Sequence, residues 1–498
     1  MPNYDTLPNQ ANYPNWILAS VGVLVAYQIA MYGWVMRIVL HPAVALWPWL
    51  MNKPGYRLYD NIYVGYGPDY MWLNGALERL LPNPELRVRL EMIALVTIST
   101  LIIFWLTTRW WGATFGLLAV ALYVFWAPVI MDYLMYFDVV VGFGGLAALA
   151  VWHRSIPKSA WWRPFVAGIF VGLTMLTKQQ GITLIAVFAI WRVLSRSWRT
   201  SPLDLVRFIL GVLIPVCITG IILSSQGLLG TTLFMLTFFI GHYVEVFSSS
   251  ISRSSELVLL VMWLGLIPFF VFYVLQRRDQ WGSEGVLLIG LLPNLLILAY
   301  PRYGRFHLSA ATPVVALMGA GAAYYAFQAF RKNGNRFWRY LRTCVVGAAA
   351  LSLIIALPLP TYYRMKLGPQ VDKFEALKPL GQWLTQYAGA APGIRAWILP
   401  DIDPTGNFYV VSDFLPPTFW TETYDIIFDR PEVGQRLIAS LKTDPPRYAV
   451  LINNWSNQAP EMLLEYLHAH YTPIGTMYLG YNINSPVIFY KLAETISL

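Results

Sequence analysis

The sequence predicts a polytopic α-helical membrane protein with about eleven transmembrane helices and a small C-terminal α/β domain outside the membrane. Hydrophobic types make up 57% of the 498 residues and charged types only 12%, about half the charged fraction of an ordinary soluble domain. Apolar runs near the length that crosses a bilayer, roughly 17–25 residues, recur up to residue 360. After Pro360 the composition becomes more polar and no run is long enough to span.

The positions of basic residues decide which apolar segments cross. The segments are 16–36, 90–108, 113–130, 133–152, 164–177, 181–195, 208–224, 228–247, 256–275, 285–300, 308–330 and 343–360. Basic clusters follow the segments that end at 152, 195, 275 and 330, and the positive-inside rule places all four on the cytoplasmic side. The four clusters share the cytoplasmic side only if segment 228–247 does not span the membrane. The prediction is therefore an integral multi-pass protein with a cytoplasmic N-terminus and an extracytoplasmic C-terminal domain.

Two long outer loops follow from this topology, at 52–89 and 224–255. In the first loop, Trp72/Leu73, Ala76/Leu77 and Leu80/Leu81 recur at helical spacing, which predicts an amphipathic helix lying in the plane of the membrane interface. The second loop contains 228–247 as a re-entrant or surface-lying segment. Residues 1–360 then form the transmembrane domain and residues 361–498 the extracytoplasmic domain.

The C-terminal domain shows alternating strand and helix patterns. Strands are predicted near 394–399, 407–412, 447–452, 473–480 and 486–491, with helices near 372–388, 431–442 and 459–470. Neither G-x-G-x-x-G nor G-x-x-x-x-G-K-[ST] occurs in this domain, so no nucleotide cofactor is expected. The net charge of +9 reflects cytoplasmic loops of a membrane protein, and no nucleic-acid partner is expected.

Unusual polar residues collect at helix ends on the predicted outer face. They are Asp60, Asp132, Asp138, Lys178, Gln179, His242, Glu245, Arg302, Arg305 and His307. Charge at membrane depth is costly, which makes each a candidate for function, although Asp60 could close a turn, Asp132 could cap a helix and Lys178 could snorkel to the interface. Transporters place such groups near the bilayer midplane, whereas here they lie at helix ends on one side. This placement indicates a cavity at the outer membrane interface, where a lipid headgroup would sit.

Four stretches in order carry a family likeness. The first loop reads Gly55, Tyr56, Tyr59-Asp60 and Gly67-Pro68 before an amphipathic helix and Arg87 and Arg89. The others are Phe137-Asp138-Val139, Gly172-Leu173 through Thr177-Lys178-Gln179, and Arg305-Phe306-His307 with Pro313. Together they resemble the GT-C membrane glycosyltransferases, in particular the bacterial dolichyl-phosphate-mannose-mannosyltransferase-like and RgtA-like branch.

The resemblance implies transfer of a sugar from a polyprenyl-phosphate carrier to a glycan, lipid or protein acceptor. The reaction would take place on the non-cytoplasmic face of a bacterial-type plasma membrane, among membrane lipids. Asp60 would be the catalytic carboxylate. Asp138 would support it or share a divalent metal ion with it. The first loop has no clear acidic pair, so dependence on a metal stays open. The substrate and carrier phosphate would be held by Lys178, Arg305 and His307, with Arg302, Tyr59 and Gln179.

Transfer of a sugar from a phosphate carrier requires residues of these types, independently of the family resemblance. A carboxylate can remove the proton from an acceptor hydroxyl, and fixed Lys and Arg groups can stabilise a departing phosphate. Attack opposite the leaving group would invert the anomeric centre. Two other classes stay open: a transporter or flippase for a lipid or anion with an outer binding domain, and a receptor or assembly scaffold without catalysis.

Overall fold

The computed structural model describes residues 14–36, 44–131, 137–153, 160–194, 202–246, 254–276, 284–299, 304–333, 336–362, 377–401, 405–421, 431–452, 460–478 and 486–493. The chain divides into two compact units. The first unit comprises Met1–Met36, Arg89–Gly220 and Ser248–Gly368. The second comprises Arg37–Val88, Ile221–Phe247 and Pro369–Leu498. Each unit therefore joins segments that are far apart in the sequence.

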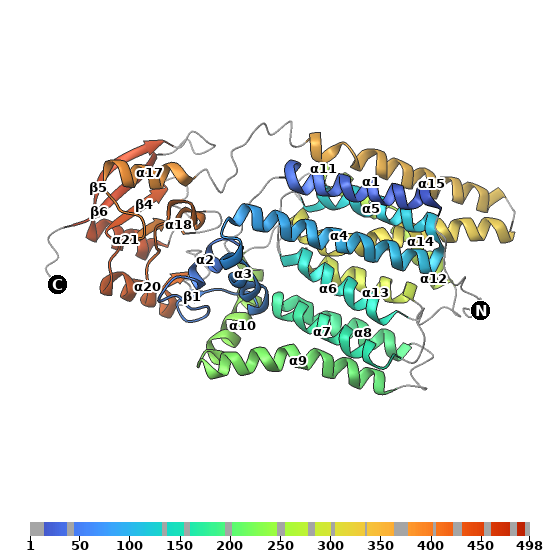
Figure 1. Ribbon diagram of the computed structural model, residues 1–498, viewed down its shortest axis with the longest axis horizontal. Helices are drawn as coiled ribbons and strands as arrows, with labels where there is room; N and C mark the ends of the chain where they lie inside the picture. Colours follow the sequence, from blue (N-terminus) through green and yellow to red (C-terminus); the bar gives the residue numbers. More distant parts are fainter. Residues whose placement is uncertain are drawn as a thin grey trace. The chain divides into compact units, whose positions relative to one another are not determined.

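The first unit is built from helices that run side by side over much of their length (Figure 1). They are α1 Asn15–Ala30, η2 Met31–Val35, α4 Pro84–Trp111, α5 Ala113–Met131, α6 Phe137–Trp152, α7 Trp162–Thr177, η3 Gln179–Ile182, α8 Thr183–Leu194, α9 Leu203–Ser225, α11 Ser254–Leu264, α12 Ile267–Leu275, α13 Glu284–Leu296, η6 Ile297–Ala299, η7 Arg305–Ala311, α14 Thr312–Asn333 and α15 Arg336–Ala356. The ends of α4 and α9 belong to the second unit.

Seven helical segments in the described part of the chain are long and apolar enough to cross a membrane. They are Asn15–Val35, Pro84–Trp111, Ala113–Met131, Leu203–Ser225, Glu256–Leu275, Arg305–Phe330 and Arg336–Tyr362. Shorter apolar helices occupy Phe137–Trp152, Trp162–Thr177, Gln179–Leu194 and Glu284–Leu296. The protein is an integral multi-pass membrane protein. Each of the eleven predicted crossings falls on one of these helices, and the number that cross stays a prediction.

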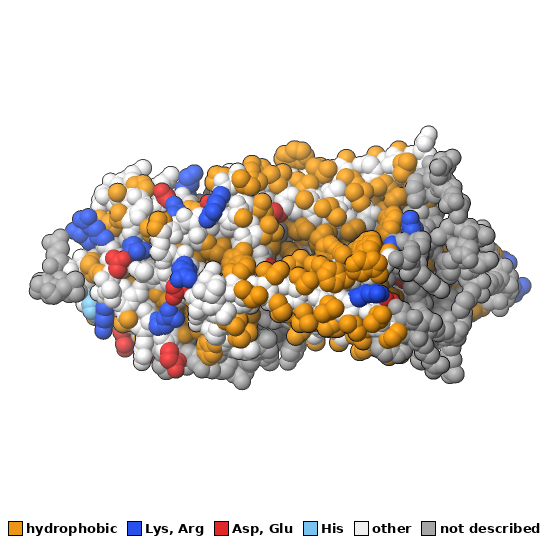
Figure 2. Space-filling model, turned by 60° about the horizontal axis from the view of Figure 1, so that its bottom comes forward, with side chains coloured by type: hydrophobic (Ala, Val, Ile, Leu, Met, Phe, Trp, Pro, Cys, Tyr) orange, Lys and Arg blue, Asp and Glu red, His pale blue; other side chains and the backbone are white. Residues whose placement is uncertain are grey.

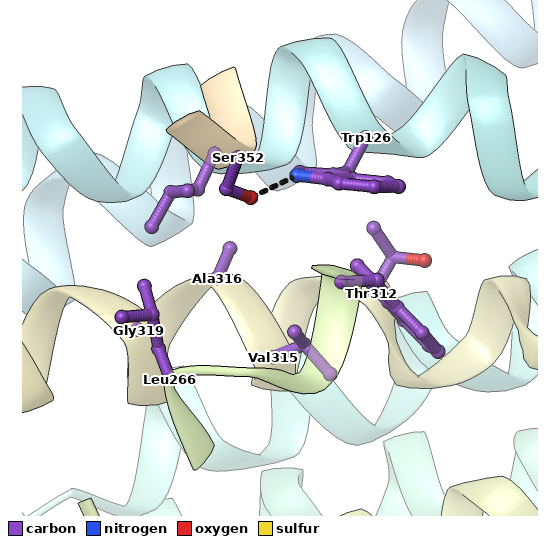
Figure 3. A pocket seen from close by; sticks show the side chains of 9 residues that line it. Trp126, Leu266, Thr312, Val315, Ala316, Gly319 and Ser352 are labelled. Carbon is purple, nitrogen blue, oxygen red and sulfur yellow. Dashed lines mark hydrogen bonds between the residues drawn. The ribbon is translucent and has the colours of Figure 1, made fainter. Parts of the chain in front are cut away.

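Packing between α5, α14 and α15 leaves almost no empty space. A cavity of about 10 Å³ lies between them and Leu266, lined on the α14 side by Thr312, Val315, Ala316 and Gly319. Figure 3 shows the indole nitrogen of Trp126 in α5 donating to the hydroxyl of Ser352 in α15, at 2.7 Å. An unpaired indole N–H in this apolar interior would cost free energy, and Ser352 satisfies it.

The surface of the first unit agrees with a lipid environment. In the view of Figure 2, hydrophobic side chains cover most of its visible described face, whereas Lys, Arg, Asp and Glu side chains gather over the second unit. Large apolar side chains on several helices are exposed, including Val23 at 68% and Ile354 at 68%. Such contiguous apolar exposure is expected where lipid, not water, is the solvent.

The second unit contains a four-stranded sheet in the order β2-β4-β6-β5. Strand β2 pairs parallel with β4, while β6 pairs antiparallel with both β4 and β5. The strands are β2 Ala396–Leu399, β4 Tyr448–Ile452, β5 Tyr471–Tyr478 and β6 Pro486–Leu492, and the helices are α2 Leu46–Met51, α3 Pro68–Leu80, α10 Leu229–Val246, α17 Lys378–Tyr387, α18 Asn407–Ser412, α20 Pro431–Thr443 and α21 Glu461–His470. Strands β2, β4, β5 and β6 fall on four of the five predicted strands, and α17, α20 and α21 fall on the three predicted helices.

One predicted strand is wrong, because residues 407–412 form the helix α18. The aromatic and β-branched run Phe408-Tyr409-Val410-Val411 favours a strand by local preference. In the helix, Phe408 and Tyr409 are both fully buried. The Tyr409 hydroxyl donates to Asp401 at 2.9 Å, while Phe408 stacks on Phe414. Tertiary contacts override the local preference here.

The first long loop is part of the second unit. Its two-residue strand β1 Ile62–Tyr63 pairs parallel with β3 Trp420–Thr421, and Tyr63 lies in the hydrophobic core of the C-terminal sheet. Met235 of α10 lies in the same core. The amphipathic helix predicted in this loop is α3, and its Leu73 and Leu80 are 54% and 77% exposed. These two leucines of the predicted apolar stripe are thus largely uncovered by protein, whereas Trp72, Leu77 and Leu81 are half-buried.

Candidate active site

A buried ionic cluster occupies the first unit. Asp138, in the first turn of α6, is fully buried. Its Oδ1 accepts a hydrogen bond from Nζ of Lys178 at 2.7 Å, and its Oδ2 lies 2.8 Å from Nδ1 of His307. An ionised carboxylate can only accept hydrogen bonds, so Nδ1 of His307 carries the hydrogen in this contact. Three residues predicted from the sequence therefore meet at one carboxylate.

Close helix packing brings the three elements together. Lys178 follows the last residue of α7 in extended backbone conformation, and His307 lies in η7. A Cβ at Gly142 of α6 would come within 2.6 Å of the Ala310 carbonyl oxygen in η7. A Cβ at Gly144 would collide with the Thr174 hydroxyl in α7. Glycine at these two positions allows the close approach that the cluster requires.

Arg305 is held by a different carboxylate. Its Nε lies 3.2 Å from Oε2 of Glu256, and its Nη1 donates to the Val129 carbonyl at 3.4 Å. Glu256 was not predicted as a site residue, although an acid in the first turn of an apolar helix is the signal that could have shown it. Gln179 is the first residue of η3 and is half-buried.

Asp60 lies in the second unit, on a tight turn of the first loop. The backbone N–H of Asp60 donates to the Arg57 carbonyl at 3.2 Å, and its Oδ2 lies 3.8 Å from Nη1 of Arg57. The side chain is 44% exposed. Tyr59 adopts a positive φ of 66°, and its ring is fully buried while its hydroxyl donates to the Tyr66 carbonyl. The tyrosine therefore fixes the turn that presents the Asp60 carboxylate.

The C-terminal part of the chain supports the same turn. Nη2 of Arg436 donates to the Asp60 carbonyl at 2.9 Å, and the Trp420 N–H donates to the Asn61 carbonyl at 2.8 Å. Trp420 is anchored in turn by its indole nitrogen, which donates to Asp401 at 2.7 Å. Neither Arg436 nor Asp401 was predicted from the sequence. Nothing local marks Arg436 as the partner of a residue 376 positions away.

The remaining predicted residues lie outside the described part of the chain. Asp132 and Arg302 fall in ranges that the structure does not describe, and so do the side chains of His242 and Glu245.

The donor set at Asp138 does not suit a divalent cation. Both of its oxygens already face nitrogen donors, one of them a lysine ammonium, and a metal there would meet a like charge. Among the described residues, no group of three or more His, Cys, Asp and Glu side chains is arranged to hold a metal ion. No metal ion is therefore assigned to Asp138.

Comparison with known proteins gives one family and several related folds. Residues 66–222 match the family described as dolichyl-phosphate-mannose-protein mannosyltransferase. Among solved structures, ArnT from Cupriavidus metallidurans bound to undecaprenyl phosphate aligns over 97% of this chain and 98% of its own, with a TM-score of 0.59 and 15% identity. The chain has the fold of the GT-C membrane glycosyltransferases. The archaeal oligosaccharyltransferase AglB from Archaeoglobus fulgidus, in complex with an inhibitory peptide and a dolichol-phosphate, aligns over 96% of this chain and 74% of its own, with a TM-score of 0.51 and 13% identity.

None of the curated proteins matches the chain significantly by sequence. The family match over residues 66–222 and the shared fold agree with the GT-C resemblance predicted from the sequence and with the enzyme class it implies, a GT-C-type glycosyltransferase. The family match runs from Tyr66 to Ile222 and so includes Asp138 and Lys178 but neither Asp60 nor His307.

Proposed function

We propose that this protein transfers a sugar from a polyprenyl-phosphate carrier to an acceptor hydroxyl on the non-cytoplasmic face of the membrane, with inversion at the anomeric carbon. The observation that carries the proposal is the fold shared over almost the full length of both chains with a protein that binds undecaprenyl phosphate. The family match over residues 66–222, which names a dolichyl-phosphate-linked sugar, supports the same class of donor.

In this proposal Asp60 is the general base. The acceptor oxygen attacks the anomeric carbon, the bond from that carbon to the phosphate oxygen breaks, and the acceptor proton passes to the Asp60 carboxylate. The electron pair of the broken bond stays on the carrier phosphate. The exposure of Asp60 and its fixed backbone suit this role, since a general base must meet the substrate in a defined position.

The carrier phosphate is assigned to the cationic residues Lys178 and Arg305, with His307 as a further donor. An ammonium or guanidinium group can donate several hydrogen bonds at once, so a contact with a carboxylate does not exhaust its capacity. Asp138 holds Lys178 and His307 in place through the contacts at 2.7 and 2.8 Å. It is a positioning residue for that pair.

The test compares Asp60→Asn with Asp413→Asn in the purified full-length protein. Asp413 is an exposed carboxylate of the same unit that faces Lys53 at 3.5 Å, so this variant removes the same charge away from the turn. Release of labelled sugar from a panel of undecaprenyl-phosphate-linked sugars should fall by roughly 10²–10⁴-fold in Asp60→Asn and stay unchanged in Asp413→Asn. Equal rates in the parent and Asp60→Asn would show that Asp60 is not the base.

A further inference from the structure

A cavity of about 310 Å³ lies in the second unit beside the Asp60 turn. Its wall comes from α2, the turn that follows it, α3, and the end of α9. The lining residues are Met51, Asn52, Tyr56, Arg57, Leu58, Trp72, Gly75, Ala76, Arg79, Leu223 and Gln226. The volume falls within the range of small-molecule sites, roughly 300–1,000 Å³. Arg57 connects this cavity to the candidate base, because it both lines the wall and faces Asp60 at 3.8 Å.

The charge of the wall is one-sided. Two guanidinium groups, from Arg57 and Arg79, line the cavity, and no carboxylate is among the lining residues. The Nε of Arg79 donates to the amide oxygen of Asn52 at 2.6 Å, which holds the guanidinium in place. The Asn52 amide donates in turn to Glu78 at 2.6 Å. This arrangement suits a bound anion, since guanidinium groups pair with phosphate and carboxylate through two parallel hydrogen bonds.

Much of the remaining wall is apolar, beside the polar Asn52, Tyr56 and Gln226, and part of it comes from the end of a candidate membrane span. Met51, Leu58, Trp72 and Leu223 supply side chains without charge. Leu223 belongs to the candidate span Leu203–Ser225, and the end of a span is the level of lipid headgroups. The exposed Leu73 and Leu80 of α3 continue the apolar surface next to the cavity. An occupant therefore carries an anionic group for the arginines and an apolar part that continues toward the membrane.

We propose that this cavity binds the acceptor, and that the acceptor is an anionic amphiphile with a phosphate or carboxylate beside its reacting hydroxyl. The assignment to the acceptor rests on the proposed function, in which Asp60 takes the acceptor proton. Arg57 then has two tasks: it binds the acceptor anion and keeps that anion next to the Asp60 carboxylate. Arg79 supplies the second contact from α3 and sets the orientation of the headgroup.

The test measures binding of dioctanoyl phosphatidic acid to the full-length protein in detergent, with dioctanoyl phosphatidylcholine as the zwitterionic comparison. The parent should bind the phosphatidic acid and discriminate against the phosphatidylcholine. Arg57→Gln and Arg79→Gln should each weaken that binding by about tenfold or more, because each removes a charge-assisted hydrogen bond. Arg447→Gln, an exposed arginine of the same unit outside the cavity, should bind as the parent does.

A second measurement separates the acceptor from the carrier. Saturating undecaprenyl phosphate should leave the binding of phosphatidic acid unchanged, and displacement would assign the cavity to the carrier and overturn the proposal. Equal binding of both lipids by the parent, no binding of phosphatidic acid, or full binding in the two arginine variants would also overturn it. Arg79→Lys should retain part of the affinity, which separates loss of charge from loss of fold. Since binding needs no turnover, a protein that binds the probe but transfers no sugar contradicts only the proposed function.

Discussion

Asp138 carries its charge inside an apolar helix because Lys178 and His307 lie against both of its oxygens. All three side chains are at most 6% exposed. In such surroundings the cost of removing a charge from water is offset only while the partners are present. The cluster is therefore both a condition for folding α6 against its neighbours and the support for the cations assigned to the carrier.

Replacement of Lys178 by methionine should destabilise the protein by about 3–5 kcal/mol, since it leaves a buried carboxylate without its cation. Thermal unfolding of the purified protein in detergent measures this. The double variant Asp138→Leu/Lys178→Met should recover much of the loss because no unpaired charge remains. Lys53→Met serves as the control, since it breaks the exposed pair with Asp413 and should change stability by no more than about 1 kcal/mol. An unfolding temperature of Lys178→Met equal to that of the parent would contradict the account.

The sequence indicated each member of the cluster but not their pairing. A charge in an apolar run is visible in the sequence, so Asp138, Lys178 and His307 could be selected one by one. The contacts join residues 40 and 169 positions apart, and a single sequence holds no signal for such a pairing. The same limit explains Glu256, whose partner Arg305 was predicted while Glu256 itself was read as part of an apolar segment.

At the scale of elements, the spacing between α6 and η7 depends on a missing side chain at Gly142. Gly142→Ala should lower stability by roughly 1–3 kcal/mol, because the new methyl group meets the Ala310 backbone at 2.6 Å and backbone cannot rotate away. Gly145→Ala in the same helix is the control, since its Cβ meets only Leu184 side-chain atoms at 3.8 Å. Thermal unfolding should separate the two variants, and equal unfolding temperatures would show that η7 does not need this approach.

Strand β3 in the second unit is anchored by a buried acid, because the indole nitrogen of its Trp420 donates to Asp401. Burial raises the pKa of Asp401 to about 8, against the hydrogen bonds from Tyr409 and Trp420, which lower it. The carboxyl is therefore protonated in the folded state over a range in which the unfolded chain, with a pKa near 3.8, is ionised. A folded pKa above the unfolded one contributes stability at low pH, and this contribution is lost as the pH rises from about 4 to about 8.

Asp401→Asn should make the stability of the protein less dependent on pH between about 4 and about 8. The amide keeps an acceptor for the Trp420 indole and cannot ionise. The unfolding temperature of the full-length protein at pH 8 should be higher in Asp401→Asn than in the parent, and the two should converge near pH 4. Asp413→Asn, at an exposed site, should follow the parent throughout. A parent and an Asp401→Asn variant with the same pH profile would show that Asp401 does not titrate in this range.

At the scale of the whole molecule, the sequence predicted the helical membrane part and a small C-terminal α/β domain but not the grouping of segments. Long apolar runs and alternating strands are local signals, and both were visible. The strands β1 and β3 have two residues each, too few for a periodic pattern, so the sequence could not show that the first loop folds with residues 369–498. The predicted boundary at 360/361 marks where the membrane part ends. The division into compact units does not test it, so it stays a prediction.

The predicted topology can be tested with reporter fusions. A reporter fused after Arg278 should report the cytoplasm and one fused after Leu380 the exterior, because the four basic clusters share the cytoplasmic side only if 228–247 does not cross. The burial of Met235 in the core of the second unit favours this placement of α10. Reporters that fall on the same side would contradict the eleven-crossing topology.

The most direct test of the central claim is whether the protein breaks the bond between a sugar and a polyprenyl phosphate. Purified protein would be reconstituted with undecaprenyl-phosphate-linked labelled sugars and a lipid extract of its own membrane, and both products would be quantified. We expect label to move to a new product while an equal amount of undecaprenyl phosphate is released, and we expect Asp60→Asn to release almost none. Label that stays on the carrier for every sugar, even where the carrier changes leaflet, would contradict the account and indicate a flippase.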